Sequence, residues 1–419
     1  MNRQEEIERA LVSRPVPEGF PSSVVLPDYA GYSIASVPSL IAGALDAVDI
    51  EAPRLRSIRL PVADRVVLLI IDGLGYRSLC RLTAGGELPA IRALMKEGLF
   101  FPLTSVFPST TVAALATLTT GLTPLSHGMI GYRLYLRESA SITNMIRFSL
   151  VGSNHNGSAI DAGLDPDRLL PRPTFYERLG GRRVSTHVLL PRHIAGSGLS
   201  EVLYRGCPNV HPMSSFSDMC VATRDILLGS TDRSLLTLYW PGLDAVAHVR
   251  GPESDAYLAE ARAVDAALGH ELIGRVDRTL FVITSDHGFV PMTTSDYLAL
   301  DEVTGVGAKP LLPPVGEPRA SYLFLRRRAN ETCDAGSVEK PKLLDGGILR
   351  LTAEQVITSG LLGDDDPHPE TLYRLGDVVL ASTGNAGVFH PYPDAAILRG
   401  MHGGLTADEM LVPLIAAAL

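Results

Sequence analysis

Short runs of continuous apolar residues, several of them rich in β-branched side chains, alternate with longer stretches of mixed character along this chain. The run Arg65–Ile71 has no polar position after its first residue, which is typical of a strand buried on both faces of a parallel sheet. Similar runs predict strands at Leu99–Val106, Val184–Leu190, Ser234–Tyr239 and Arg278–Thr284. Helices are predicted at Leu88–Glu97, at Thr111–Thr120, which Gly121 closes, and at Asp255–Leu268.

This alternation of strands and helices predicts an α/β fold with a mostly parallel central sheet and helices on both of its faces. Residues 1–60 are proline-rich and mixed, so we expect an N-terminal lead-in with one helix near Ser39–Ala47. The rest of the chain, 61–419, is expected to form one large domain. Its last apolar stretch, Ala407–Leu419, predicts a closing helix or strand.

Two segments interrupt the periodic pattern. Residues 135–174 and 294–390, approximately, are rich in Gly, Pro and Asp and lose their periodicity. We interpret both as insertions that form a cap over the large domain. One late strand is predicted near the end of the second segment, at Gly376–Ala381.

Composition narrows the classes of protein and of partner. Among 419 residues, 46% are hydrophobic and 20% are charged, as in ordinary folded proteins. The formal net charge of −9 provides no positive field for a nucleic acid polymer. The N-terminal residues are charged, and no uncharged apolar run reaches about 18 residues, so neither a signal peptide nor a membrane span is expected. These features favour a cytoplasmic protein, and they do not indicate its oligomeric state.

Acidic residues follow three of the predicted strands. Asp72 ends the first run, Asp286 and His287 follow the run that ends at 284, and Asp244 comes shortly after the run at 234–239. A single aspartate in such a place is usually a turn or helix-capping residue. In open α/β sheets, however, ligands bind outside the carboxyl ends of the strands, so these segments are expected to converge on one crevice.

Histidines accompany these carboxylates at spacings that suit metal ligation. Asp244 and His248 are four residues apart and can bind one ion from a helical turn or from a loop. Taken alone, the pair is as compatible with a helix cap and a partly buried histidine. Asp286 and His287 are adjacent, so they can share a site only if the chain turns, as Gly288 suggests.

A third histidine, His402, lies in the glycine-flanked loop Met401–Gly404. By itself it is as compatible with a histidine exposed in a turn, although glycines also allow the backbone to approach a ligand closely. Together these segments supply three Asp and three His, an oxygen and nitrogen set suited to zinc, with manganese or iron as alternatives. Six ligands are too many for one tetrahedral ion and suit two.

A hydroxyl-rich segment, Pro108–Thr111, comes before the body of a predicted helix. A helix N-terminus offers free amide donors and partial positive charge to a phosphate. A hydroxyl bound there to a divalent ion would have a lowered pKa and could attack phosphorus. Ser109 or Thr110 is expected to cap the helix, which is compatible with a nucleophile in the same segment.

These motifs together resemble the alkaline phosphatase superfamily, and within it the nucleotide pyrophosphatase/phosphodiesterase branch. The resemblance runs in order from about Val66 to Ile415 and is weakest in the two insertions. The segments that carry it are Asp72–Gly73, Pro108–Thr111, Gly121–Gly128, Tyr239–Pro252, Ser285–Gly288 and His402–Gly404. The resemblance implies an alkaline-phosphatase-like three-layer sandwich in which 61–419 is a catalytic domain with cap insertions.

The resemblance also implies two divalent metal ions, with zinc favoured. One ion would be bound by four residues: Asp72, Asp286, His287 and the nucleophile. The other would be held by Asp244, His248 and His402. In the family motif the nucleophile is the fourth residue counted from proline, which is Thr111 here rather than Thr110. His127 would be a structural element behind the nucleophile helix.

The chain departs from the family pattern at Tyr132. Phosphodiesterase members usually carry an asparagine there, about 21 residues beyond the nucleophile, that donates to a non-bridging phosphate oxygen. We interpret Tyr132 as substrate-binding, because its phenol can donate similarly, although the pocket can also serve another substrate. The expected reaction is hydrolysis of a small phosphate diester or pyrophosphate, such as a nucleotide, through a phospho-threonine on Thr111.

Three alternatives remain open at this point. The same two-metal site can serve a phosphomonoesterase or a phosphonate hydrolase. A non-catalytic binding module is the third alternative, although such a protein should have lost some ligands. Every expected ligand position here holds a suitable residue.

Overall fold

A computed structural model describes residues 3–47, 55, 57–303, 310–326, 340–393 and 396–419. Its central sheet has seven strands, in the order β2 (Leu99–Thr104), β19 (Leu411–Ala418), β9 (Thr279–Thr284), β1 (Arg65–Ile71), β8 (Ser234–Trp240), β6 (Ser185–Pro191) and β7 (Asn209–Met213). β1 pairs in parallel with β8 and β9, and β6 pairs in parallel with β7 and β8. β19 runs antiparallel to β2 and β9. The prediction of a mostly parallel sheet is therefore confirmed.

The central strand β1 explains why its sequence has no polar positions. All of its residues are buried, and successive side chains point to opposite faces of the sheet. Val66, Leu68 and Ile70 enter one hydrophobic core, whereas Val67, Leu69 and Ile71 enter the other. The register places Ile71 beside Trp240 and Ile70 beside Thr284. The three strands therefore end at nearly the same level, and the residues that follow them meet at one edge.

Helices cover both faces of this sheet. The first core includes α2 (Val37–Ala44), α5 (Thr111–Thr120), α9 (Phe175–Leu179) and α10 (Gly198–Leu203). The second core includes α3 (Tyr76–Ala84), α4 (Pro89–Glu97), α11 (Phe216–Gly229), α12 (Gly242–Arg250) and α13 (Asp255–Glu271). The predicted three-layer arrangement is confirmed. None of the helices in the described part of the chain has the length and apolar character needed to cross a bilayer.

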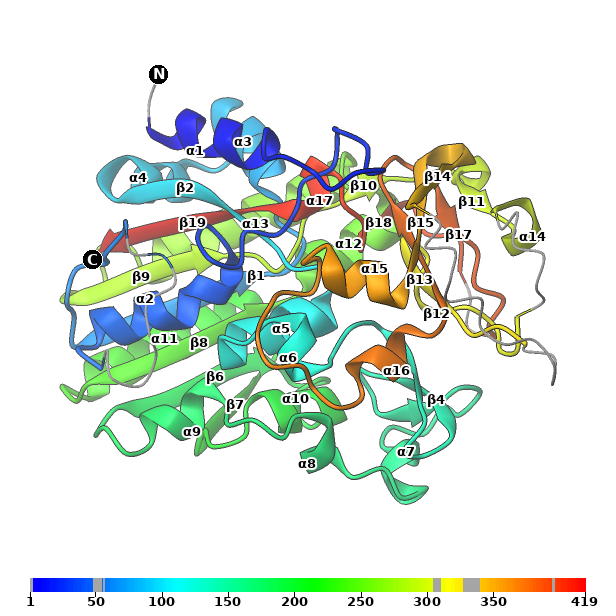
Figure 1. The fold of residues 1–419 in the computed structure, drawn as a ribbon. Helices are drawn as coiled ribbons and strands as arrows, with labels where there is room; N and C mark the ends of the chain where they lie inside the picture. Colours follow the sequence, from blue (N-terminus) through cyan, green and yellow to red (C-terminus); the bar gives the residue numbers. More distant parts are fainter. Residues whose placement is uncertain (1–2, 48–54, 56, 304–309, 327–339, 394–395) are drawn as a thin grey trace.

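The N-terminal residues pack onto the large domain. α1 (Arg3–Val12) lies near β2 and α3 in Figure 1. Ile7 and Leu11 of α1 are buried in the same core as α5. The helix predicted near 39–47 is α2, which begins and ends slightly earlier. The division into a lead-in and a large domain stays a prediction.

The two predicted insertions together form a second sheet (Figure 1, right). Its order is β14 (Lys342–Leu344), β15 (Ile348–Thr352), β16 (Val378–Ser382), β13 (Ala320–Leu323), β12 (Val315–Glu317), β3 (Arg133–Leu136), β4 (Ser141–Asn144) and β5 (Ser149–Leu150). All of these pairings are antiparallel. Strands of two to five residues are too short to produce a clear alternation, so this regular sheet was not predicted. The predicted strand at 376–381 is β16 and belongs to this sheet.

The last apolar stretch contains both predicted elements in succession, α17 (Ala407–Met410) and β19. The structure also has two small two-stranded sheets. β10 (Val290–Pro291) pairs with β18 (Gly400–Met401), and β11 (Tyr297–Leu298) pairs with β17 (Gly387–Val388). The remaining helices are short: α6 (Pro124–His127), α7 (Ser158–Asp161), α8 (Pro166–Leu169), α14 (Leu300–Val303), α15 (Ala353–Thr358) and α16 (Thr371–Leu375).

Candidate active site

Four polar side chains meet at the carboxyl edge of the central sheet. Asp72 follows β1, Asp286 and His287 follow the neighbouring β9, and Thr111 begins α5. His287 Nε2 is 3.4 Å from both Asp72 Oδ1 and Asp286 Oδ2, and 3.2 Å from Thr111 Oγ1. Ligand atoms around a tetrahedral zinc ion with bonds of about 2.0 Å are separated by about 3.3 Å. These atoms therefore have the spacing of one such site.

A second group contains Asp244, His248 and His402. Asp244 and His248 are one turn apart on α12, so the helical alternative holds. Asp244 Oδ1 lies 3.2 Å from His248 Nε2 and 3.8 Å from His402 Nε2. The Nδ1 atoms of His248 and His402 donate to the carbonyl oxygens of Gly400 and Ser109, at 2.8 and 3.0 Å. Because a carbonyl oxygen can only accept, each Nδ1 carries a hydrogen. In the neutral ring, Nε2 then has a lone pair that a metal ion can bind.

The two groups adjoin and concentrate buried carboxylates. The rings of His287 and His402 stack with their centroids 3.6 Å apart. Asp72 Oδ1 and Asp286 Oδ2 are buried and accept no hydrogen bond from the described residues. Burial, followed by the negative charges of Asp286 and Asp244, raises the pKa of Asp72. A divalent cation in each group would satisfy these oxygens and offset the repulsion, so the residues present fit a pair of metal ions.

Two glycines let the loops that carry Asp286, His287 and His402 approach their neighbours closely. A side chain at Gly288 would overlap the carbonyl oxygen of Asp408. Gly403 has a φ of +119°, which residues with a Cβ avoid. Gly288 also follows the Asp286–His287 pair, where the described chain has left the strand and both side chains can reach one site.

Thr110 occupies the N-cap position of α5, as expected, but its side chain does not make the expected capping hydrogen bond. Its hydroxyl instead donates to the carboxylate of Glu317. The Ser109 hydroxyl donates to the carbonyl of Gly404, 2.8 Å away. Among the described residues, no side chain accepts a hydrogen bond from the amide groups at the start of α5. These groups lie where an anion can bind.

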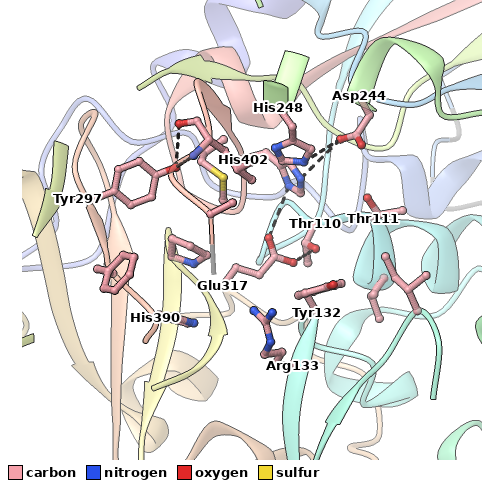
Figure 2. Close-up of a pocket in the computed structure, with 17 residues that line it drawn as sticks. Thr110, Thr111, Tyr132, Arg133, Asp244, His248, Tyr297, Glu317, His390 and His402 are labelled. Atoms are coloured by element: carbon pink, nitrogen blue, oxygen red, sulfur yellow. Dashed lines mark hydrogen bonds and ion pairs between the residues drawn. The ribbon is translucent and has the colours of Figure 1, made fainter. Parts of the chain in front are cut away.

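A cavity of about 360 Å³ opens beside these residues. Figure 2 shows Thr111, Asp244 and His248 on one side of it and Tyr297 on the other. Tyr132 lines the same cavity and is half-buried. Its ring centroid lies 4.8 Å from the guanidinium carbon of Arg133, a separation at which a cation attracts an aromatic ring.

Glu317 is a site residue that sequence reasoning missed. It comes from β12 of the second sheet, is buried, and lines the cavity. Its Oε2 atom is 3.7 Å from His402 Nδ1. Burial raises the pKa of Glu317 to about 7 against the opposing effects of the Thr110 hydroxyl and the His248 charge. No sequence signal marked it, because it lies in an insertion that matches no motif.

A buried ion pair that was also missed supports the loop of His402. Arg319 and Glu409 are both fully buried and form two hydrogen bonds at 2.5 and 2.8 Å. Arg319 also donates to three carbonyl oxygens of residues 384–386 in the second sheet region. Glu409 accepts from the backbone N–H of Gly404, 2.8 Å away. The pair therefore links the insertion to the loop that carries His402.

His127 lies behind α5, as the resemblance implies. It is fully buried, and its Nε2 is 3.1 Å from the Thr117 hydroxyl. Its Nδ1 accepts from the backbone N–H of Met129 at 3.0 Å, so it acts as a neutral acceptor. Burial, with a smaller effect of His368, lowers its pKa to about 3.

This lowered pKa predicts that His127 makes the folded protein less stable at acidic pH. The unfolded chain binds a proton at an ordinary histidine pKa of about 6.5, whereas the folded chain does so only near 3. Protonation of His127 therefore leaves the free energy of unfolding unchanged well above pH 6.5. As the pH falls from 6.5 toward 3, it lowers that free energy by up to about 1.4 kcal/mol per pH unit. His127→Gln should be less stable at pH 7.5 yet lose less stability between pH 6.5 and 4.5. Urea unfolding at several pH values measures this. The exposed His193→Gln is the control, and parallel slopes for His127→Gln and the parent would contradict the prediction.

Comparison with known proteins places these observations in context. The family model described as type I phosphodiesterase / nucleotide pyrophosphatase matches residues 66–307, more than half of the chain. An uncharacterized pyrophosphatase/phosphodiesterase of Schizosaccharomyces pombe is 25% identical over 253 residues, which are 58% of this chain and 48% of that protein. The matched region thus spans about half the length of this curated relative.

Solved structures share the fold. Murine ectonucleotide pyrophosphatase/phosphodiesterase 5, solved as an inactive threonine-to-alanine variant with AMP, is 16% identical with a TM-score of 0.60, over 84% of this chain and 87% of its own. Phosphonoacetate hydrolase from Sinorhizobium meliloti, in complex with phosphonoformate, is 19% identical with a TM-score of 0.60, over 86% of this chain and 92% of its own. At these identities the likeness concerns the fold alone.

Proposed function

Since this chain belongs to the type I phosphodiesterase / nucleotide pyrophosphatase family, as its motifs predict, we propose that it hydrolyses a small phosphate diester or pyrophosphate through a phospho-threonine on Thr111. One observation carries the proposal: the Thr111 hydroxyl lies against the first of two adjoining groups of Asp and His side chains, which are residue types that bind metal ions. A merely structural cluster would have its buried carboxylate oxygens satisfied by protein donors. Here three of those oxygens, on Asp72, Asp244 and Asp286, accept no hydrogen bond from the described residues.

The proposed metal ligands are Asp72, Asp286 and His287 in one group and Asp244, His248 and His402 in the other. Bound divalent ions, for which this oxygen and nitrogen set favours zinc, would lower the pKa of the Thr111 hydroxyl and stabilise the leaving oxygen. The carbonyl partners of His248 and His402 hold their rings in the required tautomer. His287 is held similarly, through its Nδ1 and the carbonyl of Gly288.

Thr111 performs the covalent step. Its Oγ1 forms a bond to phosphorus while the bond from phosphorus to the leaving oxygen breaks, and the threonine proton passes through solvent to that oxygen. Water then attacks the same phosphorus, the bond to Oγ1 breaks, and Thr111 regains its proton. The uncapped amides at the start of α5 can bind the phosphate oxygens throughout. We also propose that the Tyr132 hydroxyl donates a hydrogen bond to a non-bridging oxygen of the substrate phosphate.

The substrate we propose is a small molecule. A cavity of about 360 Å³ admits a ligand of ordinary metabolite size. Tyr297 and Phe389 line it and offer aromatic surface to the leaving group. The murine protein holds AMP and the bacterial hydrolase holds phosphonoformate, so small phosphorus-containing anions occupy proteins of this fold.

Glu317 favours a diester over a monoester. A diester phosphate carries one negative charge and a monoester up to two, and a carboxylate in the cavity wall repels the second charge more. Burial raises the pKa of Glu317 to about 7, and nearby divalent cations would favour its ionised form. The substrates of the two alternatives, a phosphate monoester and a phosphonate, differ from a diester in the charge on the phosphorus group.

Rates on three substrates test the proposed function. We expect the zinc-loaded protein to have a kcat/KM for bis-p-nitrophenyl phosphate at least about tenfold above that for p-nitrophenyl phosphate, a difference of about 1.4 kcal/mol. Phosphonoacetate should be hydrolysed more slowly still. Glu317→Gln keeps an acceptor for Thr110 but removes the charge, so it should lower the diester-to-monoester ratio. A parent enzyme that is fastest on the monoester or on phosphonoacetate would contradict the proposal.

A further inference from the structure

The side-chain amide of Asn144 has a defined orientation. Asn144 ends β4, where it pairs with Arg133 of β3, and is buried. Its Oδ1 accepts from the backbone N–H groups of Ile146 at 3.0 Å and Arg147 at 3.2 Å. An amide nitrogen cannot accept these two hydrogens. The oxygen must therefore face the backbone, and the NH₂ group must face the opposite way.

The group that it faces is the Tyr132 hydroxyl. Asn144 Nδ2 is 2.7 Å from the Tyr132 phenolic oxygen. Because the amide NH₂ can only donate, the phenolic oxygen accepts, and its own hydrogen is left for another acceptor. The described residues supply no acceptor for that hydrogen. Tyr132 lines the cavity together with Thr111 and Asp244, where a phosphate would offer oxygen atoms.

We propose that Asn144 is a positioning residue that makes the Tyr132 hydroxyl a hydrogen-bond donor to a non-bridging oxygen of the substrate phosphate. The inference rests on the proposed function, because it deepens the role of Tyr132 in the same site. Asn144 acts only through Tyr132, and the backbone partners of its oxygen hold it in place. A donor fixed before the substrate binds avoids the cost of reorientation during the reaction.

A double-mutant cycle tests this arrangement. Asn144→Asp keeps an oxygen for the N–H groups of Ile146 and Arg147 but turns the other amide position into an acceptor. The Tyr132 hydroxyl then donates to residue 144 and is lost to the phosphate. We expect kcat/KM for bis-p-nitrophenyl phosphate to fall about tenfold in Asn144→Asp and equally in Tyr132→Phe. The double variant should lose no more than either single variant.

The combined variant also separates hydrogen bonding from charge. A repulsive effect of the new carboxylate, or a general disturbance of the fold, would lower the activity of Tyr132→Phe further. Losses that multiply would therefore overturn the proposal, as would near-parent activity in either single variant. Thr111→Ala, assayed alongside, keeps the two failures distinct: if it retains parent activity the proposed function fails, whereas its inactivation with an active Asn144→Asp rejects only the role of Asn144.

Discussion

Replacing Thr111 by alanine is expected to lower kcat for bis-p-nitrophenyl phosphate by about a thousandfold or more, which corresponds to about 4 kcal/mol of transition-state stabilisation. The variant lacks the oxygen that lies 3.2 Å from His287 Nε2, so no covalent intermediate can form. The six Asp and His side chains of the two proposed groups remain, so the variant should still bind about two ions per chain. Steady-state kinetics with metal analysis of the same sample measures both quantities.

The neighbouring threonine provides a matched control. Thr110 is buried and its hydroxyl donates to Glu317 rather than facing the ligand groups, so Thr110→Ala should lose only a few-fold in rate. Thr111→Ser should keep measurable turnover, because the hydroxyl remains. Mass spectrometry of acid-quenched enzyme should find a phosphate on Thr111 and none on Thr110. If the kcat of Thr111→Ala is within a few-fold of the parent's, covalent catalysis by this residue is rejected.

Removing the divalent ions with a chelator is expected to reduce activity by at least about a thousandfold and to lower the stability of the fold. Asp72 and Asp286 are buried, and each has one oxygen that accepts no hydrogen bond from the described residues, so a bound cation would offset their mutual repulsion. Zinc at about 1,000 times its dissociation constant would add about 4 kcal/mol to the free energy of unfolding. Thermal unfolding with and without zinc, together with activity after zinc is returned, measures these effects.

Metal content distinguishes two sites from one. The parent should bind about two ions per chain and Asp244→Ala about one, because the other group keeps its own ligands. His187→Ala is the control, since this half-buried histidine on β6 contacts Ser185 and His211 rather than either group. Full activity in chelator-treated protein with negligible metal would refute the metal requirement.

Much of the central sheet and the candidate site was predictable from the sequence. The run of apolar residues at Arg65–Ile71 matches β1, and the helix predicted at Thr111–Thr120 matches α5. Strands buried on both faces must be apolar throughout, so the sequence marks them directly. Since parallel strands present their carboxyl ends at one edge, residues such as Asp72 and Asp286 were expected to meet, and they lie together in the structure. Their roles stay a prediction.

The insertions were not predictable in the same way. Their strands have two to five residues. They form one sheet only when the two segments meet, where β12 pairs with β3. Glu317 contacts Thr110 across 207 residues of sequence, and no local pattern indicates such a pair. Thr110 is the N-cap residue of α5, but it makes no capping hydrogen bond. The hydroxyls of Ser109 and Thr110 instead donate to partners distant in sequence, Gly404 and Glu317.

By itself, the sequence determined the class of fold, the order of the ligand-bearing segments and the family, because these follow from hydrophobic periodicity and from residue types at the ends of buried strands. Only the tertiary structure decided which hydroxyl faces the ligand groups and which carboxylate lines the cavity. It also decided the direction in which the amide of Asn144 points toward Tyr132. These features depend on hydrogen bonds between elements far apart in the chain, whose geometry exists only after the two sheets have packed together.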